Sequence, residues 1–419
     1  MRAPWVHQAP PTRAAFAARS VRDRGFTPEP APRSHRSTLV WGLLVALATS
    51  PAAADREQAQ AGSHVTLHWG IDAAHPWPCE GGNAARTGRG TGRVPEEPPR
   101  IRSEVLMGGG RSAPPIIDRH GRVWLVSSAG VRVFAPDGSE RLTAAVDPVL
   151  ATPSLLPDGR VLVATRGGDL LAFGPHQPPT SLRSLHPSLT VRLVQPDGSL
   201  VIIADDGLIR IDSASGWPSR PVLGPAGPYR PAGSPDGRRL VWIDGHSLVV
   251  HDTERGTSRR IALSGPIMAG PVLAAGGEVL AITADGLLYR VSRSGRIVSR
   301  VEVSNAAGRL DWILALGTDG CARVRLHDAP LACVERDGSL RWRLELEAQL
   351  TSISLDARDT ALAIDETGAL VAVDGSGVLR WRAPPEPHRR APRPEVAPLA
   401  DADGTVYTVA PGGWLQRWR

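Results

Sequence analysis

The feature that most constrains the fold of this chain is a repeat of about 39 residues, since turns followed by runs of Val, Leu, Ile and Trp recur from residue 113 to residue 419. Three later copies are looser and lie at Leu310–Leu316, Asp359–Ile364 and Asp403–Val409. The five clearest copies carry turn glycines at spacings of 38, 39, 39 and 40 residues, namely Gly121, Gly159, Gly198, Gly237 and Gly277. Eight copies of one unit indicate a repeat architecture whose neighbouring units share a continuous core.

Each unit has the composition of short β-strands joined by tight turns. Pro-Asp-Gly recurs at 136–138, 157–159, 196–198 and 235–237, where Pro fixes φ and Gly can adopt positive φ. The clearest unit, Glu366–Arg382, reads as an apolar strand, a Gly-Ser-Gly turn and a second strand. A repeat near 40 residues with about four short strands is typical of one propeller blade. We therefore predict an all-β, eight-bladed β-propeller of four-stranded antiparallel blades.

The two ends of the repeat region predict how the ring closes. The last repeat, Pro398–Arg419, has 22 residues, about half a unit, so its sheet would lack an outer strand. The segment Arg100–Met107, just before the first repeat, has the composition of a strand. Joining both ends of the chain in one sheet would remove an open edge. We predict that this N-terminal strand closes the ring.

The N-terminal region resembles a secretory signal. The apolar run Thr38–Ala48 follows several arginines and precedes Ala52–Ala54. Its eleven residues are too few to cross a bilayer, which needs about 20. We predict cleavage near Ala54 and an exported protein, periplasmic or secreted, with no transmembrane segment in the mature chain. The predicted parts are 1–54 (signal peptide and preceding region), 55–112 (arm and closing strand) and 113–419 (propeller).

The charge pattern gives little reason to expect nucleic acid as a partner. The net charge is +6, and every basic residue is Arg. Seven arginines and two acidic residues give residues 1–54 a charge of +5, which leaves +1 for the rest. The propeller therefore has a mixed-sign surface without a basic block. We expect a monomer that binds no nucleic acid.

The three cysteines suggest one disulfide. Cys321 and Cys333 flank two short strand-like pieces joined by a turn. Residues so placed can face each other across a hairpin, so a disulfide is plausible in an oxidising compartment. Cys79 would then be unpaired or bonded to another molecule. Three unrelated thiols remain the alternative.

Some of the twelve tryptophans follow the repeat. Trp342, Trp381 and Trp418 are 39 and 37 residues apart, which predicts that they pack between neighbouring blades. For Trp217 and Trp414, which adjoin Pro or Gly, an exposed binding surface is the alternative.

The motifs that could carry chemistry are weak, and we predict no catalytic, cofactor or metal residues. Asp401–Gly404 has two carboxylates at a calcium-loop spacing but lacks the later ligands, so a plain turn is expected. Gly88–Gly92 (GRGTG) is a fragment of a phosphate-binding pattern without the required strand and helix. His64 and His68 lie in an extended segment, which would separate the two rings by about 13 Å.

The chain resembles the eight-bladed propellers with PQQ-like repeats. The resemblance rests on G-x-L-x-A-x-D followed by a turn and Trp at Gly368–Trp381. It also rests on Trp77–Gly88, which is similar to the lead-in W-P-x-x-x-G-N-x-x-R-T-G of such proteins. It extends from about Trp69 to the C-terminus and is closest to non-enzymatic members, the BamB-type outer-membrane assembly factors. Ser234–Trp242 is also similar to blades of TolB or WD40-like propellers.

The resemblance implies a function without catalysis. Relatives of the BamB type imply an exported scaffold that binds protein partners in the cell envelope. The alternative is a PQQ- and calcium-dependent dehydrogenase, or another propeller that binds a small ligand in its central channel. Quinoprotein dehydrogenases of the family place two adjacent cysteines beside the cofactor, and this sequence has no Cys-Cys pair. We therefore predict the scaffold, with no cofactor.

Overall fold

The computed structural model describes the chain from residue 75 to its C-terminus, apart from thirteen gaps. The gaps are 107–112, 148–152, 157–158, 175–176, 185–189, 195–198, 205–206, 212–230, 304–313, 327–329, 347, 387–390 and 393–395. The contacts divide the chain into the units Met1–Ser63 and His64–Arg419, and only the second contains described residues. The predicted signal peptide, the His64/His68 pair and Trp217 lie outside the described residues.

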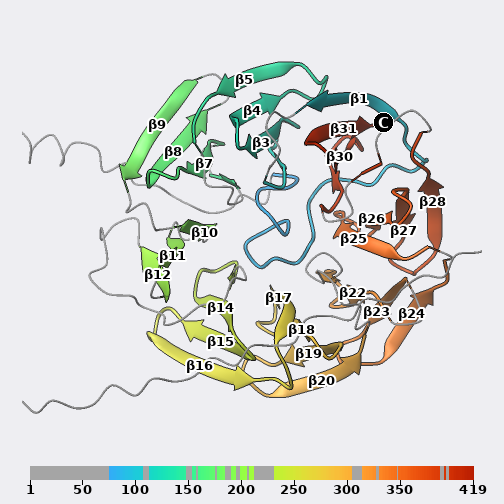
Figure 1. The fold of residues 1–419 in the computed structure, drawn as a ribbon. Helices are drawn as coiled ribbons and strands as arrows, with labels where there is room; N and C mark the ends of the chain where they lie inside the picture. The colour runs from blue at the N-terminus through green and yellow to red at the C-terminus, as the bar shows by residue number, and fades with distance from the viewer. Residues whose placement is uncertain are drawn as a thin grey trace, which may run out of the picture. The chain divides into compact units, whose positions relative to one another are not determined.

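The described strands form eight antiparallel sheets, seven of four strands and one of three, that surround a central axis as blades (Figure 1). The predicted all-β propeller is confirmed, and the number of sheets agrees with the predicted number of repeats. Blade 3 has three strands in the described residues, and residues 212–230, which follow its third strand, lie outside them. Among the described residues, no helix has the length and apolar character needed to cross a bilayer.

The strands of each blade follow one another from the axis outward. Blades 1 and 2 contain β2 (Ile116–Ile117), β3 (Val123–Ser127), β4 (Gly130–Phe134), β5 (Glu140–Ala144), β6 (Ser154–Leu155), β7 (Val161–Ala164), β8 (Asp169–Gly174) and β9 (Gln177–Ser184). Blades 3 and 4 contain β10 (Thr190–Val194), β11 (Leu200–Ala204), β12 (Gly207–Ile211), β13 (Ala232–Gly233), β14 (Arg239–Asp244), β15 (Ser247–Asp252) and β16 (Thr257–Ala262).

The later blades repeat this order. Blades 5 and 6 contain β17 (Ile267–Leu273), β18 (Val279–Thr283), β19 (Leu287–Val291), β20 (Ile297–Glu302), β21 (Leu314–Leu316), β22 (Ala322–Val324), β23 (Leu331–Val334) and β24 (Leu340–Leu344). Blade 7 contains β25 (Leu350–Leu355), β26 (Ala361–Asp365), β27 (Leu370–Val373) and β28 (Leu379–Ala383).

Blade 8 joins the two ends of the chain. It contains β29 (Leu399–Ala400), β30 (Val406–Ala410), β31 (Trp414–Trp418) and, as its outer strand, β1 (Ile101–Leu106). β1 and β31 pair antiparallel from Ile101↔Trp418 to Leu106↔Trp414, with a register shift between Ile101 and Ser103. Closure by an N-terminal strand is confirmed.

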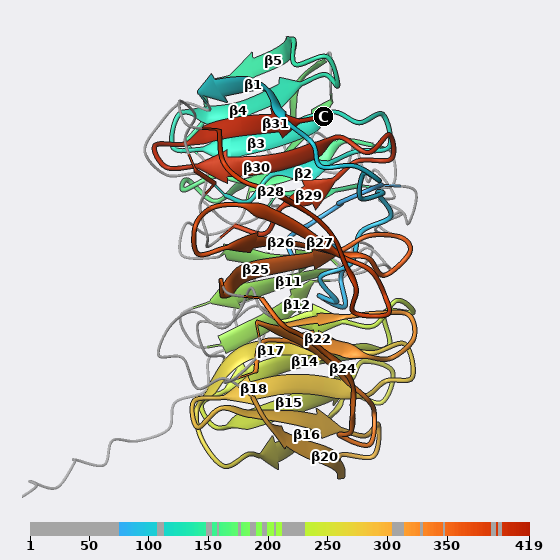
Figure 2. The same ribbon diagram turned by 90° about the vertical axis from the view of Figure 1, so that its right-hand side faces the viewer.

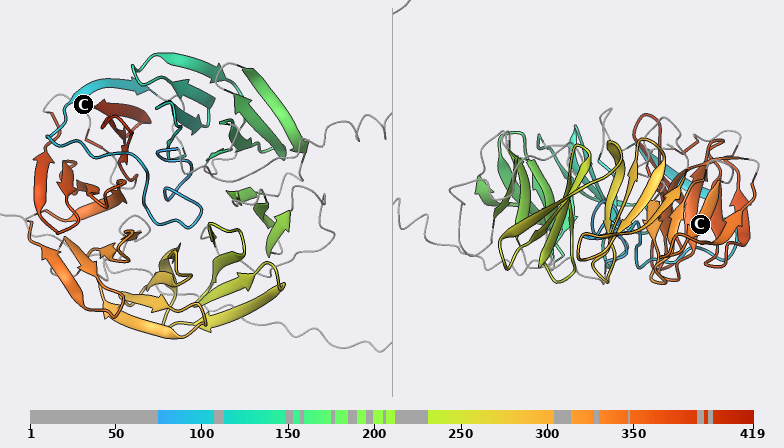
Figure 3. Two further views of the ribbon diagram at one scale, coloured as in Figure 1. Left: turned by 180° about the vertical axis from the view of Figure 1, so that it is seen from behind. Right: turned by 90° about the horizontal axis from the view of Figure 1, so that it is seen from below.

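The strands run between the two faces of the ring, and their turns lie on those faces (Figures 2 and 3). We call rim A the face that carries the turns between first and second strands and between third and fourth strands. Rim B carries the turns between second and third strands.

On rim A the first turn of a blade has a residue at positive φ whose N–H donates to a carbonyl three residues earlier, as at Gly121, Gly277 and Gly404. The repeating glycines of the sequence are therefore the positions where a side chain would strain the turn.

The core consists of apolar clusters shared by neighbouring sheets. One cluster joins Leu280 and Ile282 of blade 5 to Val324 and Val334 of blade 6. Side chains of the second and third strands are almost fully buried, while outer strands such as β16 are largely exposed. Because each blade buries its faces against both neighbours, stability depends on an unbroken ring.

Candidate functional site

The chain itself occupies the central axis at rim A. The channel segment, defined as Trp77–Arg93, crosses the middle of the ring (blue in Figures 1 and 3). Its backbone forms hydrogen bonds of 2.8 to 3.2 Å with seven of the eight blades. These bonds join Trp77 to Ile117, Pro78 to Leu155, Ala84 to Gly233, Ala85 to Leu273, Thr87 to Leu316, Gly88 and Gly90 to Leu355, and Arg93 to Asp401. Ala84 also lies in the apolar cluster of Leu193, which belongs to blade 3. The segment therefore contacts every blade.

The lead-in motif has a structural reason in this segment. The Asn83 amide donates to Thr87 Oγ1 at 2.6 Å and to the Arg89 carbonyl at 3.1 Å, which holds a compact loop. Arg86 and Gly88 in this loop have positive φ values of 58° and 69°. The polar residues of the motif thus shape the segment that fills the axis.

The glycines of GRGTG allow close packing. A Cβ at Gly90 would lie 2.4 Å from the Pro76 carbonyl oxygen, and one at Gly92 would lie 1.9 Å from that of Ala400. The segment GRGTG bridges to β25 at Arg89 and forms no strand-to-helix turn. Its glycines make room for other backbone and have no geometry that suits a phosphate.

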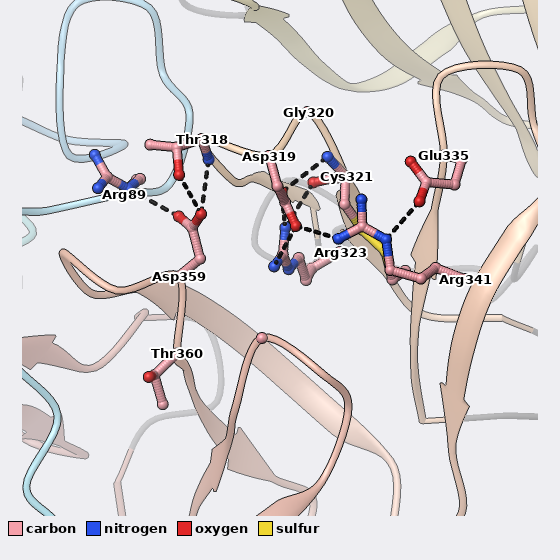
Figure 4. A network of polar contacts seen from close by, with 12 residues as sticks. Arg89, Thr318, Asp319, Gly320, Cys321, Arg323, Glu335, Arg341, Asp359 and Thr360 are labelled. Carbon is pink, nitrogen blue, oxygen red and sulfur yellow. Dashed lines mark hydrogen bonds and ion pairs between the residues drawn. A yellow bond between two sulfur atoms is a disulfide. The ribbon is translucent and has the colours of Figure 1, made fainter.

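An ionic contact fastens the channel segment to blades 6 and 7 (Figure 4). Asp359 occupies the position that is glycine in the other first turns of rim A, and its φ is +60°. Its carboxylate accepts from Arg89 Nε at 2.9 Å, from the Thr318 N–H at 2.9 Å and from the Thr318 hydroxyl. A non-glycine residue at this φ is strained, and such strain persists where surrounding contacts compensate for it. Here those contacts link three parts of the ring.

A second network stands beside it in blade 6 (Figure 4). Asp319 binds the guanidinium of Arg323 at 2.7 Å and also that of Arg341, which reaches Glu335. Arg323 is fully buried, so its charge requires the carboxylate of Asp319. The network fixes the turn Gly317–Gly320 at the edge of the channel.

These elements border one open groove on rim A. The rim groove has a volume of about 660 Å³ and lies over the channel segment and the first turns of blades 4, 5 and 6. Ala84, Ala85, Leu273 and Leu316 contribute apolar surface to it. Ala275, next to them in blade 5, is exposed.

The charged residues of the rim groove are held in ion pairs. Glu278 pairs with the buried Arg290 at 3.4 Å and with Arg336 at 2.5 Å. Arg290 also donates to the Gly320 carbonyl at 2.8 Å, which ties blade 5 to blade 6. These ion pairs orient the surface of the groove but leave it without a concentrated charge. The groove therefore suits an extended apolar or mixed surface better than a small ion.

The remaining space on the axis is small. A cavity of about 40 Å³ lies between Trp77, Arg86 and the beginnings of the inner strands. Sites for drug-sized ligands and cofactors occupy roughly 300 to 1,000 Å³, and one water takes about 30 Å³. Within the described residues, no three His, Cys, Asp or Glu side chains gather as metal ligands. This cavity, in the described part of the chain, therefore does not fit a quinone with calcium.

The three cysteines that the sequence singled out lie in blade 6 and in the channel segment. Cys321 and Cys333 are bonded across the β22–β23 hairpin, with their Cα atoms 5.6 Å apart. Cys79 takes no part in that bond and is buried in the channel segment. The disulfide lies in the blade whose first turn borders the rim groove.

The three periodic tryptophans lie at blade interfaces in two different strand positions. Trp342, in the outer strand of blade 6, donates to the Gly375 carbonyl of blade 7 at 3.0 Å. Trp381, in the outer strand of blade 7, donates to the Pro95 carbonyl at 2.8 Å. Trp418 lies in the third strand of blade 8, because the outer strand of that blade comes from the N-terminal side. Trp414 begins the same strand and is half-buried.

The Asp401–Gly404 segment is a turn of rim A. The Asp401 carboxyl is 3 % exposed and points to the first turn of blade 1, where its Oδ2 would lie 2.5 Å from a Cβ at Gly121. Burial, together with the charges of Asp403 and Asp118 and against a hydrogen bond from the Ala402 N–H, raises the pKa of Asp401 to about 6. The adjacent residues Ala402–Gly404 line a surface groove, whereas Asp401 itself is buried beneath it, so we interpret its carboxyl as a structural group.

We predict that Asp401→Asn stabilises the protein above about pH 6 and leaves its stability unchanged at pH 4. The raised pKa means that the folded state prefers the protonated carboxyl. The stability of the protein is therefore greatest below the pKa of Asp in the unfolded chain, near 4, and falls as pH rises through about 6. The amide imitates the protonated form, so at pH 8 the free energy of unfolding should rise by about 2 kcal/mol. Urea unfolding at pH 4 and pH 8 measures the difference. Asp403→Asn removes a charge that raises the pKa of Asp401, so at pH 8 it should give a smaller gain than Asp401→Asn. An equal gain from Asp401→Asn at both pH values would contradict the assignment.

Comparison with known proteins identifies the repeat. The family model described as outer membrane protein assembly factor BamB matches residues 284–416. Among solved structures, BamB from Moraxella catarrhalis matches with a TM-score of 0.51 and 19 % identity, over 77 % of this chain and 97 % of that one. No protein of curated function matches the chain. The resemblance to PQQ-like repeat propellers is therefore confirmed, and at this identity the structural match establishes the fold.

Proposed function

We propose that this protein is an exported, non-catalytic β-propeller scaffold that binds protein partners in the cell envelope through the rim groove. The observation that carries the proposal is the channel segment, which fills the axis with the chain's own backbone. A ring whose axis is filled offers its rims for contact. Rim loops on a rigid scaffold are where binding residues concentrate.

The similarity to BamB gives the proposal its cellular context. The matched family is described as an outer membrane assembly factor, and this chain has a sequence typical of a secretory signal before its propeller. The rim groove adds a concave surface with apolar residues and charges held in ion pairs. Surfaces of this composition are common in protein interfaces that form and separate.

Site-specific photocrosslinking in the native host tests the proposal. A photoreactive residue replaces Ala275, exposed in the first turn of blade 5 on rim A, or Ala284, exposed in the next turn on rim B. Both positions are alanine and lie at opposite ends of β18, so blade and residue size are matched. We expect a discrete protein adduct at Ala275 and none at Ala284. The same adduct at both positions, or no adduct at Ala275, would contradict binding through the rim groove.

A further inference from the structure

A second groove on rim A is lined by arginines. The arginine groove, of about 330 Å³, lies between the outer half of blade 4 and the turn that precedes β20 in blade 5. Four arginines and one acidic residue line it, namely Arg239, Arg255, Arg259, Arg293 and Asp252. Val250 and Ile261 provide apolar surface between them. The groove therefore has three more cationic than anionic side chains.

Backbone carbonyls position two of the guanidinium groups. Arg239 Nη1 donates to the Gly277 carbonyl at 3.2 Å, and Arg259 donates to the Ser294 carbonyl. Both bonds cross from blade 4 to blade 5. A neutral carbonyl orients a guanidinium but leaves its charge and its other N–H groups available.

The arginine groove keeps an excess of positive charge, because one acidic residue lines it beside four arginines. Arg255 pairs with Asp252 at 3.4 Å. In the described part of the chain, no carboxylate lies within 4 Å of the guanidinium nitrogens of Arg239, Arg259 or Arg293. Burial and then the charge of Arg293 lower the pKa of Arg239, against the charges of Asp236 and Asp252, which raise it.

We propose that the arginine groove binds an acidic peptide segment of the protein partner. Carboxylates match guanidinium groups in charge and geometry, and groups positioned in advance lose little entropy on binding. The groove also adjoins the rim groove, because Gly277 accepts from Arg239 while its neighbour Gly276 lines the rim groove. One partner can therefore cover both. This inference rests on the proposed function and names the chemistry of its partner.

Direct binding of a defined peptide tests the inference. The probe is a fluorescein-labelled peptide with six glutamates, and a peptide with six glutamines is its control. We expect saturable anisotropy with the purified protein at 50 mM NaCl, at least tenfold weaker binding of the glutamine peptide, and weaker binding at 200 mM NaCl. The double variant Arg259→Gln/Arg293→Gln should weaken binding at least tenfold.

A matched double variant separates binding in the arginine groove from the attraction of the acidic peptide to any positive charge on these two blades. Arg238→Gln/Arg296→Gln removes the same charge from the same two blades, outside the groove lining. It should change the affinity less than twofold, and thermal melting should show that both variants fold. Equal weakening by both variants would overturn the inference. Binding of inorganic phosphate without binding of the glutamate peptide would also overturn it.

The two experiments distinguish failure of the acidic-peptide inference from failure of the proposed scaffold. If the peptide does not bind while Ala275 still gives its adduct, the acidic-segment inference is wrong and the scaffold is retained. If the peptide binds through the arginines but Ala275 gives no adduct, binding through the rim groove is wrong and the arginine groove is retained as an acidic-peptide site.

Discussion

Replacement of β1 by a Gly-Ser sequence of equal length is expected to open the ring and to lower the melting temperature by about 6 °C. β1 forms the outer ladder of blade 8, and Ile101 lies in the cluster of Trp381 and Trp418. Loss of the strand removes that apolar burial and leaves β31 as an unpaired edge, with an estimated cost of about 4 kcal/mol. Hydrogen exchange should show lost protection in both β31 and β30.

The same replacement in β20 provides the control. β20 is also a six-residue outer strand, but it lies in the middle of the chain, so its loss leaves the ring closed. We expect lost protection only in β19 for that variant. If β30 and β31 kept their protection after replacement of β1, the N-terminal strand would not be what holds the ring together.

The ring could be predicted from the sequence because each repeat needs the same types of residue at the same positions. Turn glycines such as Gly121 and Gly277 recur since each turn needs positive φ at that residue. The half-length last repeat required an outer strand from elsewhere, and Arg100–Met107 was the adjacent segment of strand composition. Both inferences depend on local patterns that any copy of the unit must satisfy.

Other parts of the site have no such local signal. The channel segment is held by backbone hydrogen bonds to seven blades, and backbone partners impose little on the sequence. Its traces in the sequence are the lead-in motif Trp77–Gly88 and the glycines of GRGTG, and neither shows that the segment fills the axis. Asp359 replaces a turn glycine, which is why its repeat looked loose, and its role depends on Arg89, 270 residues away.

The arginine groove could not be predicted from the sequence either. Arg239, Arg259 and Arg293 come from two repeats and from different strand positions, so no repeat-based alignment brings them together. Trp418 lies in one apolar cluster with Trp381, but its spacing from Trp381 does not reveal which strand of its blade it belongs to. The N-terminal strand fills the outer position of blade 8, so Trp418 belongs to the third strand instead.

Gly92→Ala is expected to be among the most damaging single substitutions in the chain, although it adds only a methyl group. The new Cβ would lie 1.9 Å from the Ala400 carbonyl oxygen and 2.5 Å from its carbon, and backbone cannot rotate aside as a flexible side chain can. Gly92 also accepts from the Ala357 N–H, so a shift would break contacts to both blade 7 and blade 8. We expect a loss of about 3 kcal/mol in the free energy of unfolding, measured by urea denaturation.

Gly276→Ala is the matched control, because nothing lies within 4 Å of its added Cβ. It should change stability by less than about 0.5 kcal/mol, or raise it slightly by restricting the unfolded chain. A large loss at Gly92 with none at Gly276 would show that the channel segment is packed against the ring as an internal part of it. Equal, small effects at both positions would mean that the segment is loosely held, and the axis would again be open to a ligand.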